Sequence, residues 1–216
     1  MDDIGALCDK IEEQLKKYKG QRLFTVTISG IDASGKGYIT KLLQDGLEAR
    51  GYKIANINID PWQNPLPVRL QKENAAENFY DNVFRWEDFF NQLITPLQKT
   101  KRIYLETKLI RSDADEYYPF LYDHRSLDIL LLEGILLFQK KYLGYYDYKI
   151  WVDCSFETGI KRAIDRNIEN LDEEQLISDY NRYYYPAQQL HFLKDEPQKI
   201  ADLIFSNDEK EPLSGN

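Results

Sequence analysis

The sequence predicts one domain of three-layer α/β architecture, with a parallel central sheet and helices on both faces. A strand, a glycine-rich turn, a helix and a second strand follow one another between residues 23 and 59, which is the order of a βαβ unit. Further strand-like segments alternate with helical ones. The 216 residues are 43% hydrophobic and 30% charged, which suits a folded domain rather than a disordered chain.

The first half of the chain supplies the βαβ unit. Apolar residues at helical spacing predict an amphipathic helix over residues 3–18. The β-branched and apolar composition of the next segment is typical of a buried strand. The unit then consists of a strand over 23–29, a helix over 38–50 and a second strand over 53–59.

The second half of the chain is less regular. The three prolines of residues 61–67 predict a loop, and residues 86–98 have the period of a helix. Residues 103–110 and 117–122 predict a hairpin across an acidic turn. The remaining elements are strands over 128–134, 148–153 and 201–207, and helices over 157–168 and 173–193.

No repeat, low-complexity tract or linker divides the chain. We therefore expect a single domain over residues 1–216. Its parts would be an N-terminal helix (1–20), a hairpin insertion (101–125), a lid with the helix after it (157–194) and a frayed tail (208–216).

The turn after the first strand reads GIDASGKGYIT, from Gly30 to Thr40. Gly30, Gly35 and Lys36 fit the phosphate-loop pattern G-x-x-x-x-G-K-[ST]. A plain glycine turn is the alternative. The position between a buried strand and a helix favours phosphate binding, because backbone N–H groups and the helix N-terminus converge there on one anion. The residues expected to contact the nucleotide are Gly30, Asp32, Ala33, Ser34, Gly35, Lys36, Gly37 and Tyr38.

The last position of the pattern departs from the rule, since Gly37 has no hydroxyl to offer a Mg²⁺ ion. Magnesium keeps several waters and often needs only one or two protein ligands, so a site remains feasible. Thr40 lies almost a full turn further along the helix and is a poor substitute. Asp60 and Glu133, at the ends of the second and third strands, are the candidate acids.

Three later segments complete a pattern. They are LLLEGILLF (130–138), YYDYKIWVDCSFETGIKRAIDRN (145–167), and YYYPAQQLHF with ADLIFSN (183–192 and 201–207). Together with the phosphate loop and the strand before Asp60, they resemble P-loop kinases of the uridine kinase, phosphoribulokinase and pantothenate kinase type. The segments follow the family order over most of residues 22–207. The resemblance implies the P-loop NTPase fold.

The resemblance also implies roles for single residues. Asp60 matches the acid that takes a proton from the acceptor hydroxyl, and Glu133 matches the acid near the metal. Arg162 and Arg166 match lid arginines that face the ATP phosphates, where a guanidinium can stabilise the transferring group. The catalytic residues would thus be Asp60, Lys36 and Arg166. A turn aspartate, a hydrogen-bonded strand-end acid and a solvated helix face are the alternatives.

We therefore expect ATP-dependent phosphoryl transfer, with Mg²⁺, to a hydroxyl of a small metabolite such as a nucleoside, a sugar or a vitamin. The preference for ATP over GTP follows family habit alone, and no Asn-Lys-x-Asp signature of a GTPase is present. Gly37, and the acidic stretch IENLDEE where the family has an Arg-Gly-Arg turn, favour an alternative. This is a regulatory or vestigial nucleotide-binding protein.

The acceptor is not identified. The first arm of the hairpin lacks the tyrosine and histidine with which uridine kinases read pyrimidines, so uracil specificity does not carry over. Lys108, Arg111 and His124 are candidate acceptor contacts on the hairpin, and Arg182 is a candidate replacement for the missing lid arginines.

Bulk properties limit the partners. The net charge of −8 argues against a nucleic-acid surface. The longest apolar run, 129–138, is interrupted by Glu133 and too short to span a membrane. With only Cys8 and Cys154, and a start unlike a signal peptide, we expect a cytoplasmic protein. Its N-terminal helix could pack on a second subunit in a homo-oligomer.

Overall fold

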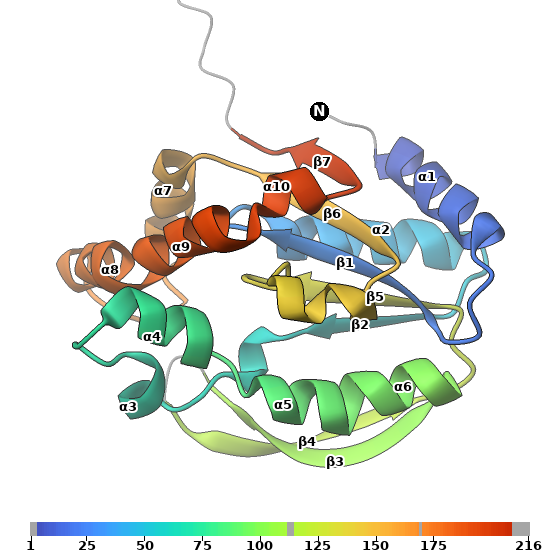
Figure 1. The fold of residues 1–216 in the computed structure, drawn as a ribbon, viewed down its shortest axis with the longest axis horizontal. Coiled ribbons are helices and arrows are strands. Elements are labelled where there is room, and N and C mark those ends of the chain that lie inside the picture. Colours follow the sequence, from blue (N-terminus) through green and yellow to red (C-terminus); the bar gives the residue numbers. More distant parts are fainter. Residues whose placement is uncertain (1–3, 112–114, 169, 209–216) are drawn as a thin grey trace, which may run out of the picture.

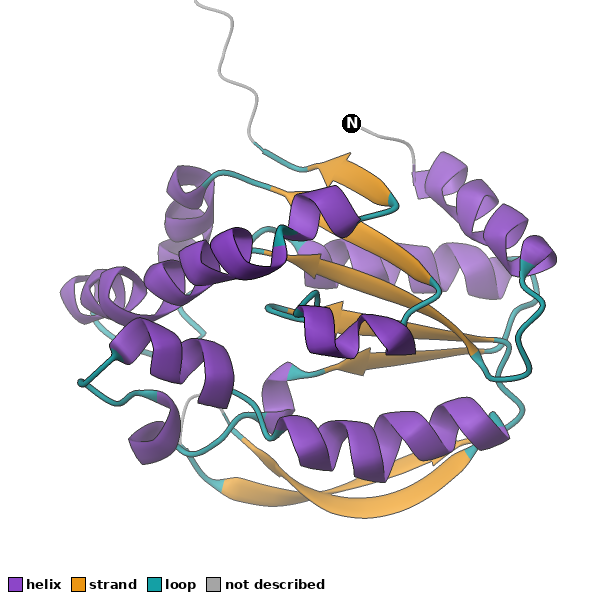
Figure 2. Cartoon of the chain, in the orientation of Figure 1, coloured by secondary structure: helices purple, strands orange, loops and turns teal. Residues whose placement is uncertain are grey.

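The centre of the protein is a five-stranded parallel sheet with the order β2-β5-β1-β6-β7. The computed structural model describes residues 4–111, 115–168 and 170–208. The arrangement confirms the predicted parallel α/β architecture, and Figures 1 and 2 show helices on both sides of the sheet. The strands are β1 (Phe24–Gly30), β2 (Ile54–Asn58), β5 (Ile129–Gly134), β6 (Tyr148–Asp153) and β7 (Leu203–Ser206).

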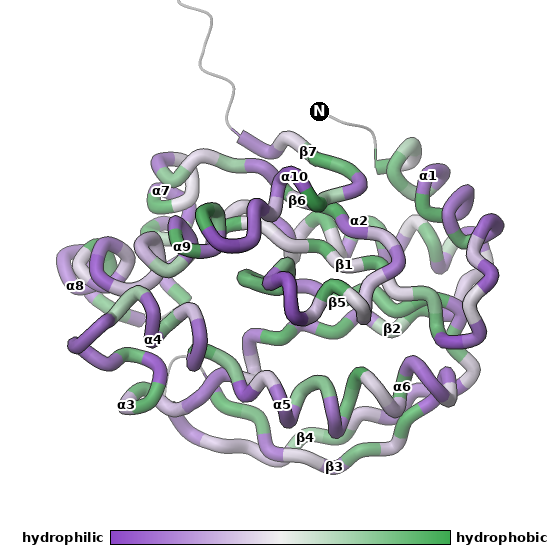
Figure 3. The backbone as a smooth tube through the Cα atoms, viewed as in Figure 1, coloured by the Kyte–Doolittle hydropathy of each residue, from purple (hydrophilic) through white to green (hydrophobic). Residues whose placement is uncertain are grey.

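Each face of the sheet carries its own hydrophobic core. Because side chains alternate along a strand, Ile129 and Leu131 of β5 pack toward α1 (Ile4–Lys17) and α2 (Lys36–Ala49), on one face. Leu130 and Leu132 pack into the core on the other face. Figure 3 shows β5 as a mostly apolar strand. The apolar side of α1 is thus covered within this chain, in part by α2.

Two long helical stretches each contain a π-helical segment that ends two positions before a proline. The first runs through α5 (Trp86–Asp88), η2 (Phe89–Ile94) and α6 (Thr95–Thr100), with Pro96 near the start of α6. The second repeats this pattern before Pro186. Proline has no N–H and crowds the preceding turn, and a wider turn relieves this without breaking the helix. The second stretch comprises α8 (Glu173–Asp179), η4 (Tyr180–Tyr184) and α9 (Tyr185–Asp195).

The segment predicted as a lid, which keeps that name below, begins with α7 (Phe156–Arg166). This helix lies with α8 beside the carboxyl ends of the strands (Figure 1). The short α10 (Pro197–Ile200) leads from α9 into β7. A further short helical turn, η3 (Lys140–Tyr145), connects β5 to β6. No helix of the described ranges has both the length and the apolar character needed to cross a bilayer.

The prediction for residues 61–67 as a loop was wrong in part. The 3₁₀ turn η1 (Asp60–Trp62) follows β2, and α3 (Leu66–Arg69) starts within the proline-rich stretch. The carboxylate of Asp115, from the distant hairpin turn, accepts hydrogen bonds from the backbone N–H of Leu66 and so caps α3. A second helix in this region, α4 (Ala75–Asn82), is not predicted from the sequence, because its eight residues carry only a short apolar stripe.

The hairpin forms as predicted and stands apart from the main sheet. Its strands β3 (Ile103–Ile110) and β4 (Tyr117–His124) pair antiparallel, from Ile103 opposite His124 to Ile110 opposite Tyr117. Figure 1 shows the hairpin below the helical stretch of α5 and α6. Part of the predicted acidic turn, and all but the first residue of the predicted frayed tail, lie outside the described residues.

Candidate active site

The phosphate loop joins the end of the central strand β1 to the start of α2. A Cβ atom on Gly30 would lie 2.5 Å from the carbonyl oxygen of Val152 and 2.7 Å from Ser34 Oγ, so no side chain fits there. Gly35 has φ +89° and Ala33 has φ 54°, both in the left-handed region. These positions turn the backbone sharply before the helix starts, which is the geometry that presents N–H groups to an anion.

Lys36 belongs to this loop and is only 5% exposed. Its Nζ donates to the carbonyl oxygen of Ile31 at 3.3 Å, so the side chain folds back along the loop. Ser34 is fully buried, and Tyr38 is 69% exposed on the outer side of α2. The hydroxyl of Thr40 donates to the carbonyl oxygen of Lys36 at 2.8 Å. Thr40 therefore does not replace the hydroxyl missing at position 37.

Asp32 links the phosphate loop to the lid. Its carboxylate accepts hydrogen bonds from the backbone N–H of Ala33 at 2.8 Å, from Arg166 Nη2 at 3.1 Å and from the hydroxyl of Tyr180. Burial raises the pKa of Asp32, but Arg166, Lys36 and these hydrogen bonds outweigh it and hold the pKa below its ordinary value. Asp32 is thus an ionised group that holds Arg166 at the loop.

Arg162 and Asn207 brace the loop from the other side. Asn207 Nδ2 donates to the carbonyl oxygen of Ser34 at 2.7 Å, and Arg162 Nη2 donates to the carbonyl oxygen of Asn207 at 3.0 Å. Arg162 Nη1 lies 3.5 Å from the same oxygen of Ser34. The site prediction omitted Asn207, although it ends the family-like segment ADLIFSN.

Glu133 and Asp60 come from neighbouring strands. Asn58, the last residue of β2, pairs with Glu133 of β5, and Asp60 follows two residues later in η1. Glu133 is 6% exposed, and burial raises its pKa to about 7 although Lys36 opposes the shift. Burial likewise raises the pKa of Asp60, again against the effect of Lys36. Lys36 and Arg166 both oppose these shifts, and the charge of Asp60 adds to the shift of Glu133.

The surroundings of Glu133 fit a divalent cation. Its carboxylate has no hydrogen-bond donor among the residues that the structure describes. A buried carboxylate without a donor is costly unless a cation meets it. A Cβ atom on Gly37 would lie 3.7 Å from Glu133 Oε2, so space is left between them. The described ranges contain no cluster of three or more metal-ligating side chains, and Mg²⁺ would keep mostly water ligands.

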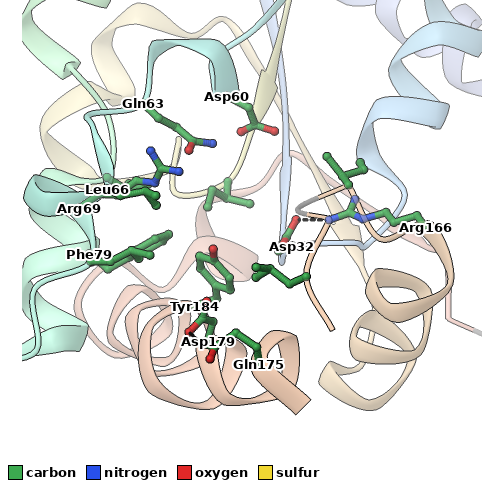
Figure 4. A pocket seen from close by; sticks show the side chains of 15 residues that line it. Asp32, Asp60, Gln63, Leu66, Arg69, Phe79, Arg166, Gln175, Asp179 and Tyr184 are labelled. Carbon is green, nitrogen blue, oxygen red and sulfur yellow. Dashed lines mark hydrogen bonds and ion pairs between the residues drawn. The ribbon is translucent and has the colours of Figure 1, made fainter. Parts of the chain in front are cut away.

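A cavity of about 350 Å³ opens beside Asp32, Asp60 and Arg166, which all line it. Figure 4 shows Asp60 and Gln63 on one side, and Asp32 bound to Arg166 on another. One wall comes from α3 and α4 and the opposite wall from the lid. The lining residues are Asp32, Asp60, Gln63, Leu66, Arg69, Leu70, Phe79, Val83, Ile135, Arg166, Ile168, Leu171, Gln175, Asp179 and Tyr184.

The structure does not place the predicted acceptor contacts at this cavity. Lys108, Arg111 and His124 belong to the hairpin or its turn and do not line it. Arg182 is exposed, with its guanidinium 5.7 Å from the ring centre of Tyr183, and does not line it either. The wall instead includes Arg69, which lies in a stretch where the sequence predicts no helix or strand. Only the tertiary fold brings this stretch opposite the lid.

The strand order, with the phosphate loop after the central strand and two acids at neighbouring strand ends, defines the class as the P-loop NTPase fold. Solved structures share it over most of their length. A possible uridine kinase from Bacillus stearothermophilus is 20% identical, with a TM-score of 0.74, over 94% of this chain and 96% of its own.

Two further structures agree. A candidate fructose transport system kinase from a Silicibacter species is 18% identical, with a TM-score of 0.70, over 95% of this chain and 100% of its own. A D-glycerate 3-kinase from Cryptococcus neoformans is 11% identical, with a TM-score of 0.65, over 86% and 87%. No protein-family model matches the chain, and no curated protein sequence matches it significantly. At these identities the likeness establishes the fold, as the sequence resemblance implied.

Proposed function

We propose that this protein is a small-molecule kinase that transfers the γ-phosphoryl group of ATP to a hydroxyl group. The observation that carries the proposal is electrostatic. Burial raises the pKa values of Asp60 and Glu133, Lys36 and Arg166 oppose this shift, and Asp32 adds to it. Five charged groups therefore act on one another at the end of the sheet, beside a cavity that can hold an acceptor.

Each of these groups suits one task. The N–H groups of the phosphate loop and Lys36 would bind the phosphates. Asp60 would accept a hydrogen bond from the acceptor hydroxyl and take its proton as the oxygen bonds to the γ-phosphorus and the bond to ADP breaks. The raised pKa of Asp60 makes it a better proton acceptor than an ordinary aspartate. Arg166, held by Asp32, would stabilise the moving charge.

Glu133 would hold Mg²⁺, which when bound supplies positive charge to the phosphates. Gly37 contributes no ligand, so this chain would rely more on Glu133 and water than a loop with serine or threonine does. The lid residues on the cavity wall would limit access of water to the transferring group.

The test measures ADP release with Mg²⁺ and a panel of nucleosides, sugars and vitamins. For the best acceptor, Asp60→Asn should lower kcat by about 10²- to 10⁴-fold while ATP still binds. Lys36→Ala should weaken ATP binding itself. Lys41→Ala is the matched control, since Lys41 lies on the same helix, exposed and paired with Asp45.

Two outcomes contradict the proposal. ATP binding without transfer to any acceptor supports the regulatory or vestigial nucleotide-binding protein, which Gly37 favours. Full turnover and full ATP affinity in both Asp60→Asn and Lys36→Ala would mean that the likeness to P-loop kinases is architectural alone.

A further inference from the structure

The cavity is lined by one cationic side chain, Arg69, that has no role in the proposed phosphoryl transfer. Arg69 is the last residue of α3 and is 4% exposed, yet it lines the cavity. Figure 4 shows it reaching in from α3, while Asp60 reaches in from η1. The same cavity thus joins the proposed proton acceptor to a buried guanidinium.

Among the residues that the structure describes, one nitrogen of Arg69 has hydrogen-bond acceptors. Its Nη1 donates to the carbonyl oxygen of Asn64 at 2.6 Å and to Asp115 Oδ1 at 3.3 Å. For Nη2 and Nε, the described part of the chain offers no hydrogen-bond acceptor. A guanidinium has five donors in a planar fork, and the unused edge matches the two oxygens of a carboxylate or a phosphate.

The neighbouring carboxylates leave this charge poorly balanced. Both oxygens of Asp115 accept the backbone N–H of Leu66, at 2.9 and 3.1 Å, so its ion pair with Arg69 is long. Burial lowers the pKa of Arg69 below its ordinary value, although Tyr184 and Asp115 oppose the shift. On the cavity wall, Asp32 is bound to Arg166, and Asp179 accepts a hydrogen bond from Gln175 Nε2 at 2.8 Å. A buried cation in this state needs a further anion.

Apart from polar groups such as Asp60 and Arg69, much of the cavity wall is apolar. Its apolar residues include Leu66, Leu70, Phe79 and Val83. A volume of about 350 Å³ lies at the low end of the range for small-molecule sites. Resting on the proposed function, we propose that the acceptor is a compact hydroxy compound with an anionic group, whose carboxylate or phosphate binds Arg69 while its hydroxyl lies at Asp60.

The test compares acceptors that differ only in the anionic group. The carboxylate pairs are glycerate with glycerol, gluconate with glucitol, and pantothenate with panthenol. The phosphate pair is glucose 6-phosphate with glucose. For at least one pair, the anionic member should have the higher kcat/KM, and the chemistry of that pair distinguishes carboxylate from phosphate.

The variant is Arg69→Gln. It should lower the preference for the anionic member by about 10- to 100-fold, mainly through KM, because a hydrogen-bonded charge pair is lost. The preference is a ratio within one variant, so loss of folded protein cancels. Arg22→Gln is the matched control. Arg22 lies just before β1 and, like Arg69, donates hydrogen bonds to a backbone oxygen and to an aspartate, here those of Tyr145 and Asp147. If Arg69 acted only by supporting α3 through Asp115, Asp115→Asn should change the preference for the anionic member as much as Arg69→Gln does.

The inference is overturned if every pair favours its neutral member, or if Arg69→Gln leaves the ratio unchanged. If no member of these pairs is phosphorylated, calorimetry with the same pairs in the absence of ATP decides the inference, while the wider acceptor panel decides the proposed function separately. Tighter binding of an anionic member that Arg69→Gln abolishes supports it, and equal or absent binding of both members overturns it.

Discussion

The raised pKa of Glu133 makes a definite prediction about stability. Burial holds this pKa at about 7, against an ordinary value of 4.5, with Asp60 and Asp32 adding to the shift and Lys36 and Arg166 opposing it. Between these two values the unfolded chain has released the proton and the folded chain has kept it. The free energy of unfolding therefore falls as the pH rises through this window and stays low above it.

The size of the effect follows from the two pKa values. The difference, 7 − 4.5, is about 2.5 pH units, and each unit corresponds to about 1.4 kcal/mol, so ionised Glu133 destabilises the metal-free protein by about 3 kcal/mol. Glutamine has nearly the shape of the protonated acid and carries no charge. We expect Glu133→Gln to be more stable than the native protein by up to about 3 kcal/mol at about pH 8, with little difference at about pH 4.5.

The assay is urea unfolding in the presence of a chelator at both pH values, with the exposed Glu73→Gln as the control. Adding Mg²⁺ at the higher pH should stabilise the native protein and leave Glu133→Gln unchanged, because ligand binding to the folded state adds stability. A variant less stable than the native protein at about pH 8, or a difference that does not change with pH, would refute the reasoning.

Three further substitutions test the phosphate loop. Gly37→Ser would place a hydroxyl next to Glu133, because a Cβ atom at this position lies 3.7 Å from Glu133 Oε2, an ordinary van der Waals contact. The added ligand should lower the Mg²⁺ concentration for half-maximal turnover by up to about tenfold. An unchanged Mg²⁺ titration would contradict this. Gly30→Ala forces a contact of 2.5 Å with the carbonyl oxygen of Val152 and should lower the urea midpoint by an amount equivalent to about 1–3 kcal/mol, so unchanged unfolding would show that the loop is looser than described. Thr40→Val removes the hydroxyl that donates to Lys36 and should reduce stability by about 1 kcal/mol with no change in the Mg²⁺ titration; a change there would make Thr40 a metal ligand after all.

Local patterns were enough to predict the phosphate loop and its two flanking elements. A β-branched run, a glycine turn and an amphipathic helix are each set by neighbours within a few residues, and strand ends follow from the same patterns. This is why Asp60 and Glu133 could be named as strand-end acids, and the structure places them at the ends of adjacent strands, with Asp60 in the turn after β2. The hairpin was predictable for the same reason.

The wall of the cavity and the contact of Asn207 with the phosphate loop were not predictable in this way. α3 depends on a cap from Asp115, more than forty residues away, as the separation of 49 in sequence shows. Asn207 reaches the loop only because β7 lies next to β6 in the sheet. Neither contact leaves a local signal in the sequence. The sequence instead suggests the hairpin residues Lys108, Arg111 and His124 as candidate acceptor contacts, and these do not line the cavity.

The sequence alone determined the class of fold, the phosphate loop and the charged groups at the strand ends, because hydrophobic period, glycine and strand length act over short distances. The tertiary structure decided which of those groups share one electrostatic field, that Asp32 holds Arg166, and that a buried Arg69 lies across the cavity from the lid. These features arise from the packing of segments far apart in sequence, and burial, which sets their charges and pKa values, exists only once the chain is folded.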